Sequence, residues 1–262
     1  MLSSPTITMA NSDIGKEKRF FKNLPAGFVL GEDAAQQRLF REYGAIFVAR
    51  GGVVAPNKVV FRDAAEVDEF QSRLDIAEGE VGEFSLELQA VAMDALLAAI
   101  AEAADSDLSI TPRGADSARR NYDDTIELWK TRVEPALEHW VNNGRLISEK
   151  ADMIRSLAPF EQVPEVFALE EDGIFFSKDL SKSIIYSVAP PGASQHLSLL
   201  AFDVSEFDDP AVRDILAKHY WYQTVVSDLP HFTYLGVRRE ELHGLGLQLV
   251  ENNGHEFWVP DV

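Results

Sequence analysis

Residues 189–204, APPGASQHLSLLAFDV, place a turn, a histidine and a carboxylate within one short stretch of chain. The Pro-Gly turn leads to His196, and the apolar run over residues 198–204 predicts a strand that carries Asp203. Ala201 and Asp203 are two residues apart and therefore share one face of that strand. A histidine in the preceding loop can turn back over this face. Because imidazole and carboxylate are both good zinc ligands, the stretch predicts half of a metal site.

A second stretch, SDLPHFTYLG at residues 227–236, supplies what the first one lacks. Two protein ligands are too few for a catalytic zinc ion, which usually has three protein ligands and one water. His231 is the candidate third ligand. Asp228 precedes it by three residues across a proline turn, so its carboxylate can reach a water at the metal. That is the position required of a general base.

A single histidine is more often a surface residue or a satisfied buried residue than a metal ligand. The other four histidines of the chain keep that interpretation: His139 and His219 fall in predicted helices, His243 in a loop, and His255 at the start of the last predicted strand. His196 and His231 differ from them because each stands at the mouth of a predicted strand near a carboxylate.

Composition limits the classes of function. The chain has 262 residues, 46% of them hydrophobic, which is enough for one large domain or for one domain with a sizeable N-terminal extension. The net charge of -19 repels phosphate backbones and anionic lipid, which argues against nucleic acid as a partner and against docking to a membrane surface. The absence of cysteine excludes disulfides, thiolate zinc sites and cysteine nucleophiles.

Targeting signals are not visible in the sequence. No apolar run approaches the roughly 18 residues that span a bilayer, so no membrane-spanning segment is expected. Residues 1–25 lack the apolar core of a signal peptide and are expected to form a disordered lead-in.

Helical patterns dominate the first half of the chain and strand patterns dominate the second, which predicts an α+β domain with an antiparallel sheet. Asp63 is the expected cap of one helix, and Pro135 is expected to kink or divide another. Helices are predicted within residues 33–49, 57–74, 84–107, 121–144 and 209–221. The first of these ranges ends in a β-type run, and the second begins with a short strand that leads into its helix. Further strands are predicted at residues 108–111, 183–189, 198–204, 222–227, 232–237 and 256–260.

Two motifs in this order resemble a known family. Ser194, His196, Ala201 and Asp203 spell S-x-H-x-x-x-x-A-x-D, and residues 228–232 spell Asp-x-Pro-His-Phe. Both are similar to motifs of the zinc D-alanyl-D-alanine carboxypeptidases and dipeptidases of the VanY/VanX type and of the related L-alanoyl-D-glutamate endopeptidases. The resemblance covers about residues 85–262. It implies a Hedgehog/DD-peptidase-like fold, with helices packed on a central antiparallel sheet.

The resemblance also assigns roles and a domain arrangement. It implies one zinc ion per chain held by His196, Asp203 and His231, with Asp228 as the base. Residues 81–262 would form the catalytic domain, and residues 1–80 an N-terminal α/β extension or accessory layer. A weak boundary near residue 80, at AEGEVGE, fits this division.

An upstream arginine contacts the substrate in this family, after a Ser-x-Tyr-Arg-Ser segment. Ser117, Arg120, Asn121 and Tyr122 match that segment approximately. Arg120 is therefore expected to contact substrate, with Arg113 and Arg119 as competing candidates. The alternative is that these arginines brace the helix that follows.

Three further residues are expected at the substrate groove. Ser194 is expected there because of its place in the first motif, and Trp221 and Tyr222 because they stand just before a strand. The two aromatic residues fit a role in the core equally well. The chain also departs from the family at two points. Leu199 stands where the family has glycine, and Asp228 stands where the carboxypeptidase branch has glutamate. The shorter acid matches the endopeptidase branch.

The function implied by the resemblance is zinc-dependent hydrolysis of amide bonds in peptidoglycan stem peptides or other peptides containing D-amino acids. Carboxypeptidase and endopeptidase action both stay open, as does the oligomeric state. The substrate implies a periplasmic or extracellular location. Two alternatives are an inactive peptidoglycan- or metal-binding module of the same fold, and an α+β domain whose histidines and aspartates are structural.

Overall fold

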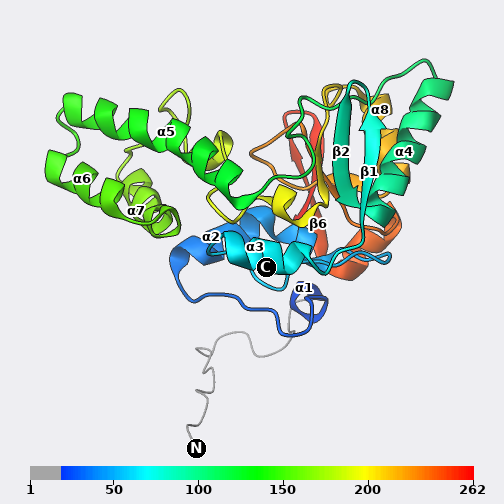
Figure 1. Cartoon of the computed structure of the whole chain (residues 1–262), viewed down its shortest axis with the longest axis horizontal. Helices are drawn as coiled ribbons and strands as arrows, with labels where there is room; N and C mark the ends of the chain where they lie inside the picture. Colours follow the sequence, from blue (N-terminus) through cyan, green and yellow to red (C-terminus); the bar gives the residue numbers. More distant parts are fainter. Residues whose placement is uncertain (1–18) are drawn as a thin grey trace, which may run out of the picture.

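The computed structural model describes residues 19–262 and shows a mixed α+β chain with small antiparallel sheets, which confirms the predicted class (Figure 1). Residues 1–18, most of the predicted disordered lead-in, lie outside the described residues. None of the helices in the described part has the length and apolar character needed to cross a membrane.

The elements alternate along the chain rather than separating into halves. The helices are α1 (Arg19–Lys22), α2 (Ala34–Tyr43), α3 (Ala64–Gln71), α4 (Ala90–Asp105), α5 (Tyr122–Asn142), α6 (Ser148–Ser156), α7 (Pro159–Glu171) and α8 (Pro210–Lys218). Short 3-10 helices are η1 (Gly44–Val48), η2 (Ile184–Tyr186), η3 (Gln195–Ser198) and η4 (Arg239–Leu245). The strands are β1 (Ile76–Val81), β2 (Phe84–Gln89), β3 (Ala201–Asp203), β4 (Trp221–Gln223), β5 (His231–Tyr234), β6 (Leu247–Asn252) and β7 (His255–Pro260).

Local chemistry explains where the longer helices begin. Asp63 caps α3 as predicted, because its side chain accepts a hydrogen bond from the amide of Glu66 at 2.9 Å. Asn121 and Asp124 form a reciprocal capping box at the start of α5. This helix continues through Pro135, so the prediction that the proline divides it is wrong.

The central sheet has the order β3-β5-β4 and is antiparallel throughout. Its register pairs Asp203 with His231 and Ala201 with Thr233. Because side chains alternate along a strand, these four residues share one face. Phe202 and its partner Phe232 point to the other face and are buried in the main core or against it.

The predicted helix over residues 84–107 is wrong in its first part. Phe84–Gln89 is strand β2, which pairs with β1 across a turn at Gly82, and the helix α4 begins only at Ala90. Alternate residues Leu86 and Leu88 are buried, which is the period of a strand. The expected boundary near residue 80 falls inside this hairpin.

Four other predicted strands are also wrong. Residues 184–186 and 44–48 form the 3-10 helices η2 and η1, and residues 108–111 and 58–61 form no strand, with only isolated bridges at Pro112 and Lys58. In η1 and η2 consecutive apolar side chains are buried, whereas a strand would direct neighbouring side chains to opposite faces. A short apolar run does not by itself distinguish these cases.

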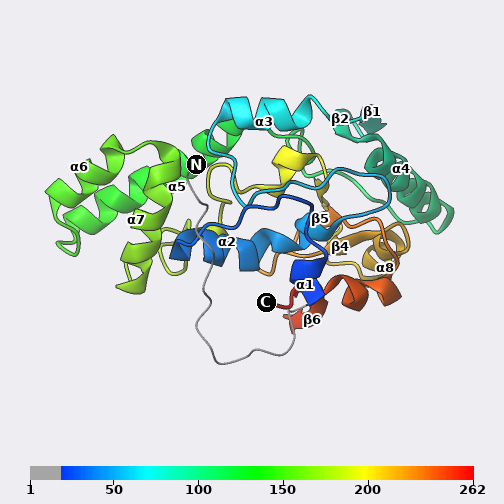
Figure 2. The same ribbon diagram turned by 90° about the horizontal axis from the view of Figure 1, so that it is seen from below.

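Helices α5, α6 and α7 lie together at one end of the molecule, and β1, β2, α4 and α8 lie at the other end in both views (Figure 2). The N-terminal elements contribute to the same hydrophobic core as the C-terminal strands. Phe20, Phe40 and Phe47 belong to one buried cluster with Trp221 and Trp258.

Backbone contacts fasten the N-terminal region to the two segments that carry the predicted metal ligands. The Phe61 amide donates to the Gly192 carbonyl at 3.0 Å, four residues before His196. The Arg50 amide donates to the Leu235 carbonyl at 2.9 Å, just after β5. A Cβ at Gly192 would lie 1.8 Å from the Phe61 carbonyl oxygen, so only glycine permits this approach.

Replacing Asp63 by alanine is expected to lower the free energy of unfolding by about 1 kcal/mol, because the first turn of α3 loses its cap. Chemical denaturation measures the change. Asp68→Ala is the control, since Asp68 is exposed in the middle of the same helix and its side chain forms no hydrogen bond or ion pair among residues 19–262. Equal destabilisation by the two substitutions would contradict the role of the cap.

Candidate metal centre

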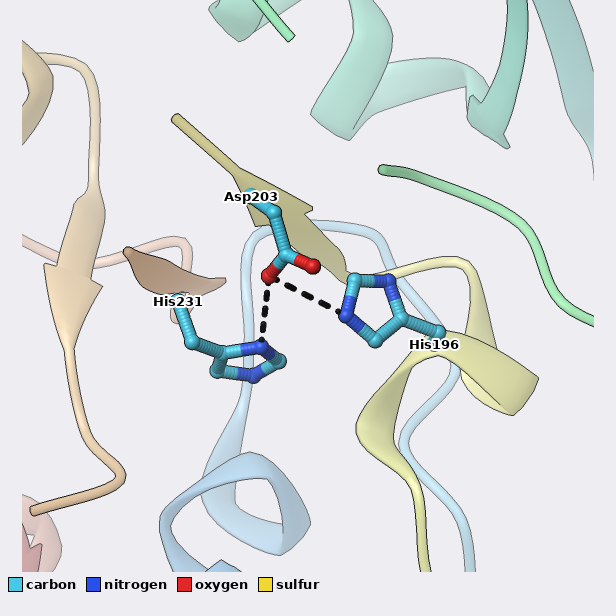
Figure 3. A group of neighbouring side chains, drawn as sticks. All are labelled: His196, Asp203 and His231. Carbon is cyan, nitrogen blue, oxygen red and sulfur yellow. Dashed lines mark hydrogen bonds and ion pairs between the residues drawn. The ribbon is translucent and has the colours of Figure 1, made fainter. Parts of the chain in front are cut away.

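His196, Asp203 and His231 come together as predicted from the two motifs (Figure 3). His196 is on η3, Asp203 ends β3 and His231 begins β5. The Oδ1 atom of Asp203 lies 3.2 Å from His196 Nε2 and 3.1 Å from His231 Nδ1. The three ligand atoms all lie within 4.8 Å of one another, and both rings are buried. The arrangement can hold a metal ion.

The loop between His196 and the strand reverses through a strained residue. Leu199 ends η3 in the left-handed conformation, with φ of 57° and ψ of 32°. This conformation costs a side chain larger than glycine roughly 1–2 kcal/mol. This is the position at which the sequence departs from the glycine expected by resemblance, and a glycine would adopt the same conformation without strain. Complete burial of the Leu199 side chain offsets the strain.

Hydrogen bonds on the far side of each ring fix the tautomers of the histidines. The Ala118 carbonyl accepts from His196 Nδ1 at 2.7 Å. His231 Nε2 donates to Gln195 Oε1 at 2.9 Å. The orientation of the Gln195 amide is determined because its Nε2 donates to the Tyr43 carbonyl at 2.8 Å. In the neutral rings the remaining nitrogens, His196 Nε2 and His231 Nδ1, therefore carry lone pairs.

Both lone pairs point at a carboxylate rather than at a proton donor. Burial lowers the pKa of His196 to about 4, with the charge of Arg120 as a further cause, so this ring is neutral at pH 7. Two imidazole lone pairs and one carboxylate oxygen facing a common point form a donor set suited to zinc.

Arg120 holds the other oxygen of this carboxylate. Its Nη2 donates to Asp203 Oδ2 at 3.0 Å and lies 3.7 Å from Asp116 Oδ2. Arg120 thus orients Asp203 so that Oδ1 alone faces the histidines. Of the competing candidates, Arg119 pairs with Glu87 and Gln71, away from the metal centre. Arg113 is exposed.

A cavity of about 210 Å³ adjoins the three ligands. Its wall includes Ser194 and Asp228, as predicted, and also Tyr43, which the sequence did not indicate. Three arginines line it: Arg113, Arg120 and Arg132. The cavity therefore brings together the candidate ligands, the candidate base and a group of positive side chains.

Asp228 is exposed to water, yet protein surrounds much of its carboxyl group. This desolvation and the negative charge of Asp203 raise the pKa of Asp228, and the charges of His231, Arg120 and Arg113 oppose the rise. A carboxyl with a raised pKa is a better proton acceptor than an ordinary aspartate once it is ionised.

Trp221 and Tyr222 stand outside this cavity. They line a different cavity of about 410 Å³ between α8, β4 and the β6–β7 hairpin. Trp221 is completely buried and packs edge-on against Tyr234 at 5.4 Å. The Tyr222 hydroxyl donates to the Val237 carbonyl at 2.9 Å. The core interpretation therefore replaces the groove interpretation for both residues.

The four remaining histidines also lie away from the metal centre. His219 contacts Glu102, His255 contacts Asp208 and Gln223, His243 contacts the Leu247 carbonyl, and His139 packs against Trp140. The sequence did not predict two groups that support the histidines, the side chain of Gln195 and the carbonyl of Ala118. Gln195 lies inside the first motif, but no pattern marks it as the partner of a histidine 36 residues later.

Comparisons of this chain with family models, with curated proteins and with solved structures found no match.

Replacing Gln195 by methionine is expected to weaken zinc binding about 10- to 100-fold, because His231 loses the acceptor that orients its ring. Competition with a chromophoric chelator measures the dissociation constant. Gln89→Met is the matched control: Gln89 is equally buried and holds Val54 and Ser198, but touches neither histidine. If both variants bind zinc equally well, Gln195 does not support the site.

Replacing Asp228 by asparagine is expected to stabilise the metal-free protein at pH 7. The pKa of Asp228 is higher in the folded chain than in the unfolded chain, so ionisation favours unfolding as the pH rises through the folded-state pKa. The variant should then have the higher Tm at pH 7. The difference should disappear below the unfolded-state pKa of about 3.9, where both residues are neutral.

Thermal unfolding in the presence of a chelator, at several pH values, measures this difference. Asp68→Asn serves as the control for the loss of a surface charge. A Tm at pH 7 that is unchanged or lowered by Asp228→Asn would show that the carboxylate is not held in an unfavourable environment.

Proposed function

We propose that this chain is a zinc-dependent peptidase that cleaves amide bonds in peptidoglycan stem peptides. One observation carries the proposal: His196 Nε2, His231 Nδ1 and Asp203 Oδ1 converge, and the hydrogen bonds to Ala118 and Gln195 direct both imidazole lone pairs inward. Three nitrogen and oxygen donors beside an open cavity are the donor set of a catalytic zinc site.

The donor set supports zinc over the harder cations. Two imidazoles and one carboxylate suit zinc, whereas magnesium and calcium take mostly oxygen ligands. Bound there, zinc would polarise a substrate carbonyl and lower the pKa of a coordinated water toward about 7. The chain's own groups perform the remaining tasks.

Asp228 is the proposed general base. It lies in the wall of the same cavity as the three ligands, and it is not among the residues that could hold the metal. Its carboxylate would accept a proton from the attacking water and deliver it to the leaving amine. Arg120 would keep Asp203 ionised and oriented through the hydrogen bond to Oδ2.

The substrate class rests on the two motifs rather than on the cavity alone. Ser194, His196, Asp203, Asp228 and His231 resemble the functional residues of D-alanyl-D-alanine carboxypeptidases and L-alanoyl-D-glutamate endopeptidases in type and order. The proposed fold assignment is the Hedgehog/DD-peptidase-like one. It is supported by the small antiparallel sheet that presents Asp203 and His231 on one face.

The experiment that tests the proposal begins with metal content. The protein purified without chelator is expected to hold about one zinc per chain, and His196→Ala is expected to lose it. His219→Ala is the control, because His219 caps the end of α8 and its side chain bonds to Glu102 on α4, away from the three candidate ligands. A wild-type protein that takes up no zinc would overturn the proposal.

Activity is then tested on purified peptidoglycan, with and without chelator, and mass spectrometry identifies the bond cut. Asp228→Ala is expected to keep its zinc and to lose hydrolysis by 100-fold or more, the scale of general-base catalysis. Hydrolysis retained by this variant would remove Asp228 from the role of base. Zinc binding by the wild type without any cleavage would favour a binding module.

A further inference from the structure

Arg132 lies in the wall of the metal-site cavity, and its printed hydrogen bonds go to Thr131 rather than to a candidate ligand or the candidate base. It belongs to α5, which supplies neither a metal ligand nor the candidate base. Its neighbours at helical spacing, Leu128, Trp129, Pro135 and Ala136, are all apolar. The usual helical ion pair to an acid three or four residues away is therefore impossible for Arg132.

The guanidinium of Arg132 is only partly satisfied. Its Nη1 donates to Thr131 Oγ1 at 2.8 Å and lies 3.4 Å from the Thr131 carbonyl, which lacks an amide partner because Pro135 follows four residues later. Its Nε atom is buried and has no hydrogen-bond partner within residues 19–262. Buried donors without a partner are rare, and each one calls for a physical explanation.

Several arginines of this acidic chain form no ion pair, but among residues 19–262 only Arg132 combines this with a buried guanidinium nitrogen that has no hydrogen-bond partner. Acidic residues outnumber basic ones by 43 to 24, and other arginines pair with carboxylates, among them Arg38 with Glu170 and Arg155 with Glu134. No ion pair involves Arg132 in the described part of the chain.

The other charges of the cavity leave Arg132 available to a ligand. Asp116 and Asp203 both face Arg120. Asp228 feels Arg120 and Arg113 among its main electrostatic neighbours, and Arg132 is not one of them. The hydrogen bonds of Arg132 go only to Thr131, so none of these acidic groups occupies its guanidinium.

We propose that Arg132 binds a carboxylate of the substrate and so makes the proposed peptidase selective for acidic peptides. The guanidinium fork matches a carboxylate with two parallel hydrogen bonds, and a partly desolvated arginine gains more from such a pair than an exposed one. The carboxylate is either an acidic side chain or a free C-terminus, since both present the same group. The reaction rests on the proposed function, but the binding step can be measured without it.

Calorimetric titration of the zinc-loaded protein with small peptides tests the proposal. One pair of probes is N-acetyl-D-glutamyl-glycinamide and its D-glutaminyl counterpart, which differ in a side-chain carboxylate. The other pair is N-acetyl-glycyl-D-alanine and its C-terminal amide, which differ in the terminal carboxylate. The pair whose acid binds more tightly than its amide identifies the source of the carboxylate.

Arg132→Gln is expected to weaken binding of that acidic probe about tenfold or more, and to leave binding of its amide unchanged. Arg132→Lys should restore part of the affinity, because it keeps the charge without the fork. Lys130→Gln is the matched control: it removes one positive charge from the same helix, but Lys130 is exposed and pairs with Glu127. It should change the affinity less than twofold.

Zinc content and thermal unfolding of each variant verify that the fold and the metal site are intact. Equal affinity of the wild type for acid and amide would overturn the proposal. An affinity for the acid that is unchanged in Arg132→Gln would do the same. So would the absence of binding of either acid up to about 10 millimolar, roughly the limit of a weak specific site. If the protein binds the acid through Arg132 but cleaves no peptide, the proposed peptidase activity is wrong and the proposed carboxylate-binding role of Arg132 still stands.

Discussion

The pairing of Asp203 with His231 across β3 and β5 is the constraint on which the candidate site depends. Side chains alternate along a strand, so a slip of one residue in this register would turn His231 to the opposite face and bring Phe232 to the metal centre. The buried ring of Phe232 on the far face opposes that slip, because it would have to enter a polar cavity. Hydrophobic packing behind the sheet therefore fixes the geometry of polar groups in front of it.

The donor set could be predicted from sequence because its members lie in two compact motifs, with Asp203 and His231 at ends of short strands and His196 in the turn before one of them. The supporting groups could not. A backbone carbonyl such as that of Ala118 has no sequence signal, and Gln195 acts on a histidine that is distant in the chain. Arg120 was expected at the substrate because of its motif. It lines the cavity and also contacts Asp203, an arrangement that only the folded chain reveals.

The fold class was predictable from patterns, but several element types were not. Residues 84–89 alternate like a strand and run directly into an alanine-rich helix, so a single helical pattern covered both. The segments at 44–48 and 184–186 are apolar because they are buried, and burial does not determine whether the backbone is extended or turned. In the second of these, the amide of Ile184 donates to the buried carboxylate of Glu170, a tertiary contact that competes with strand pairing.

The close approach of Phe61 to Gly192 ties the candidate metal centre to residues that precede position 80. The backbone of residues 50–61 holds both the turn before His196 and the segment after β5, and Tyr43 accepts the hydrogen bond that orients Gln195. The two histidines are thus held in place by parts of the chain that precede residue 80. A shortened chain beginning at residue 81 would retain every proposed metal ligand and yet lack the scaffold that gives them one shape. The candidate metal centre therefore could not be transferred to another protein as residues 81–262 alone, because the residues that shape it lie on both sides of position 80.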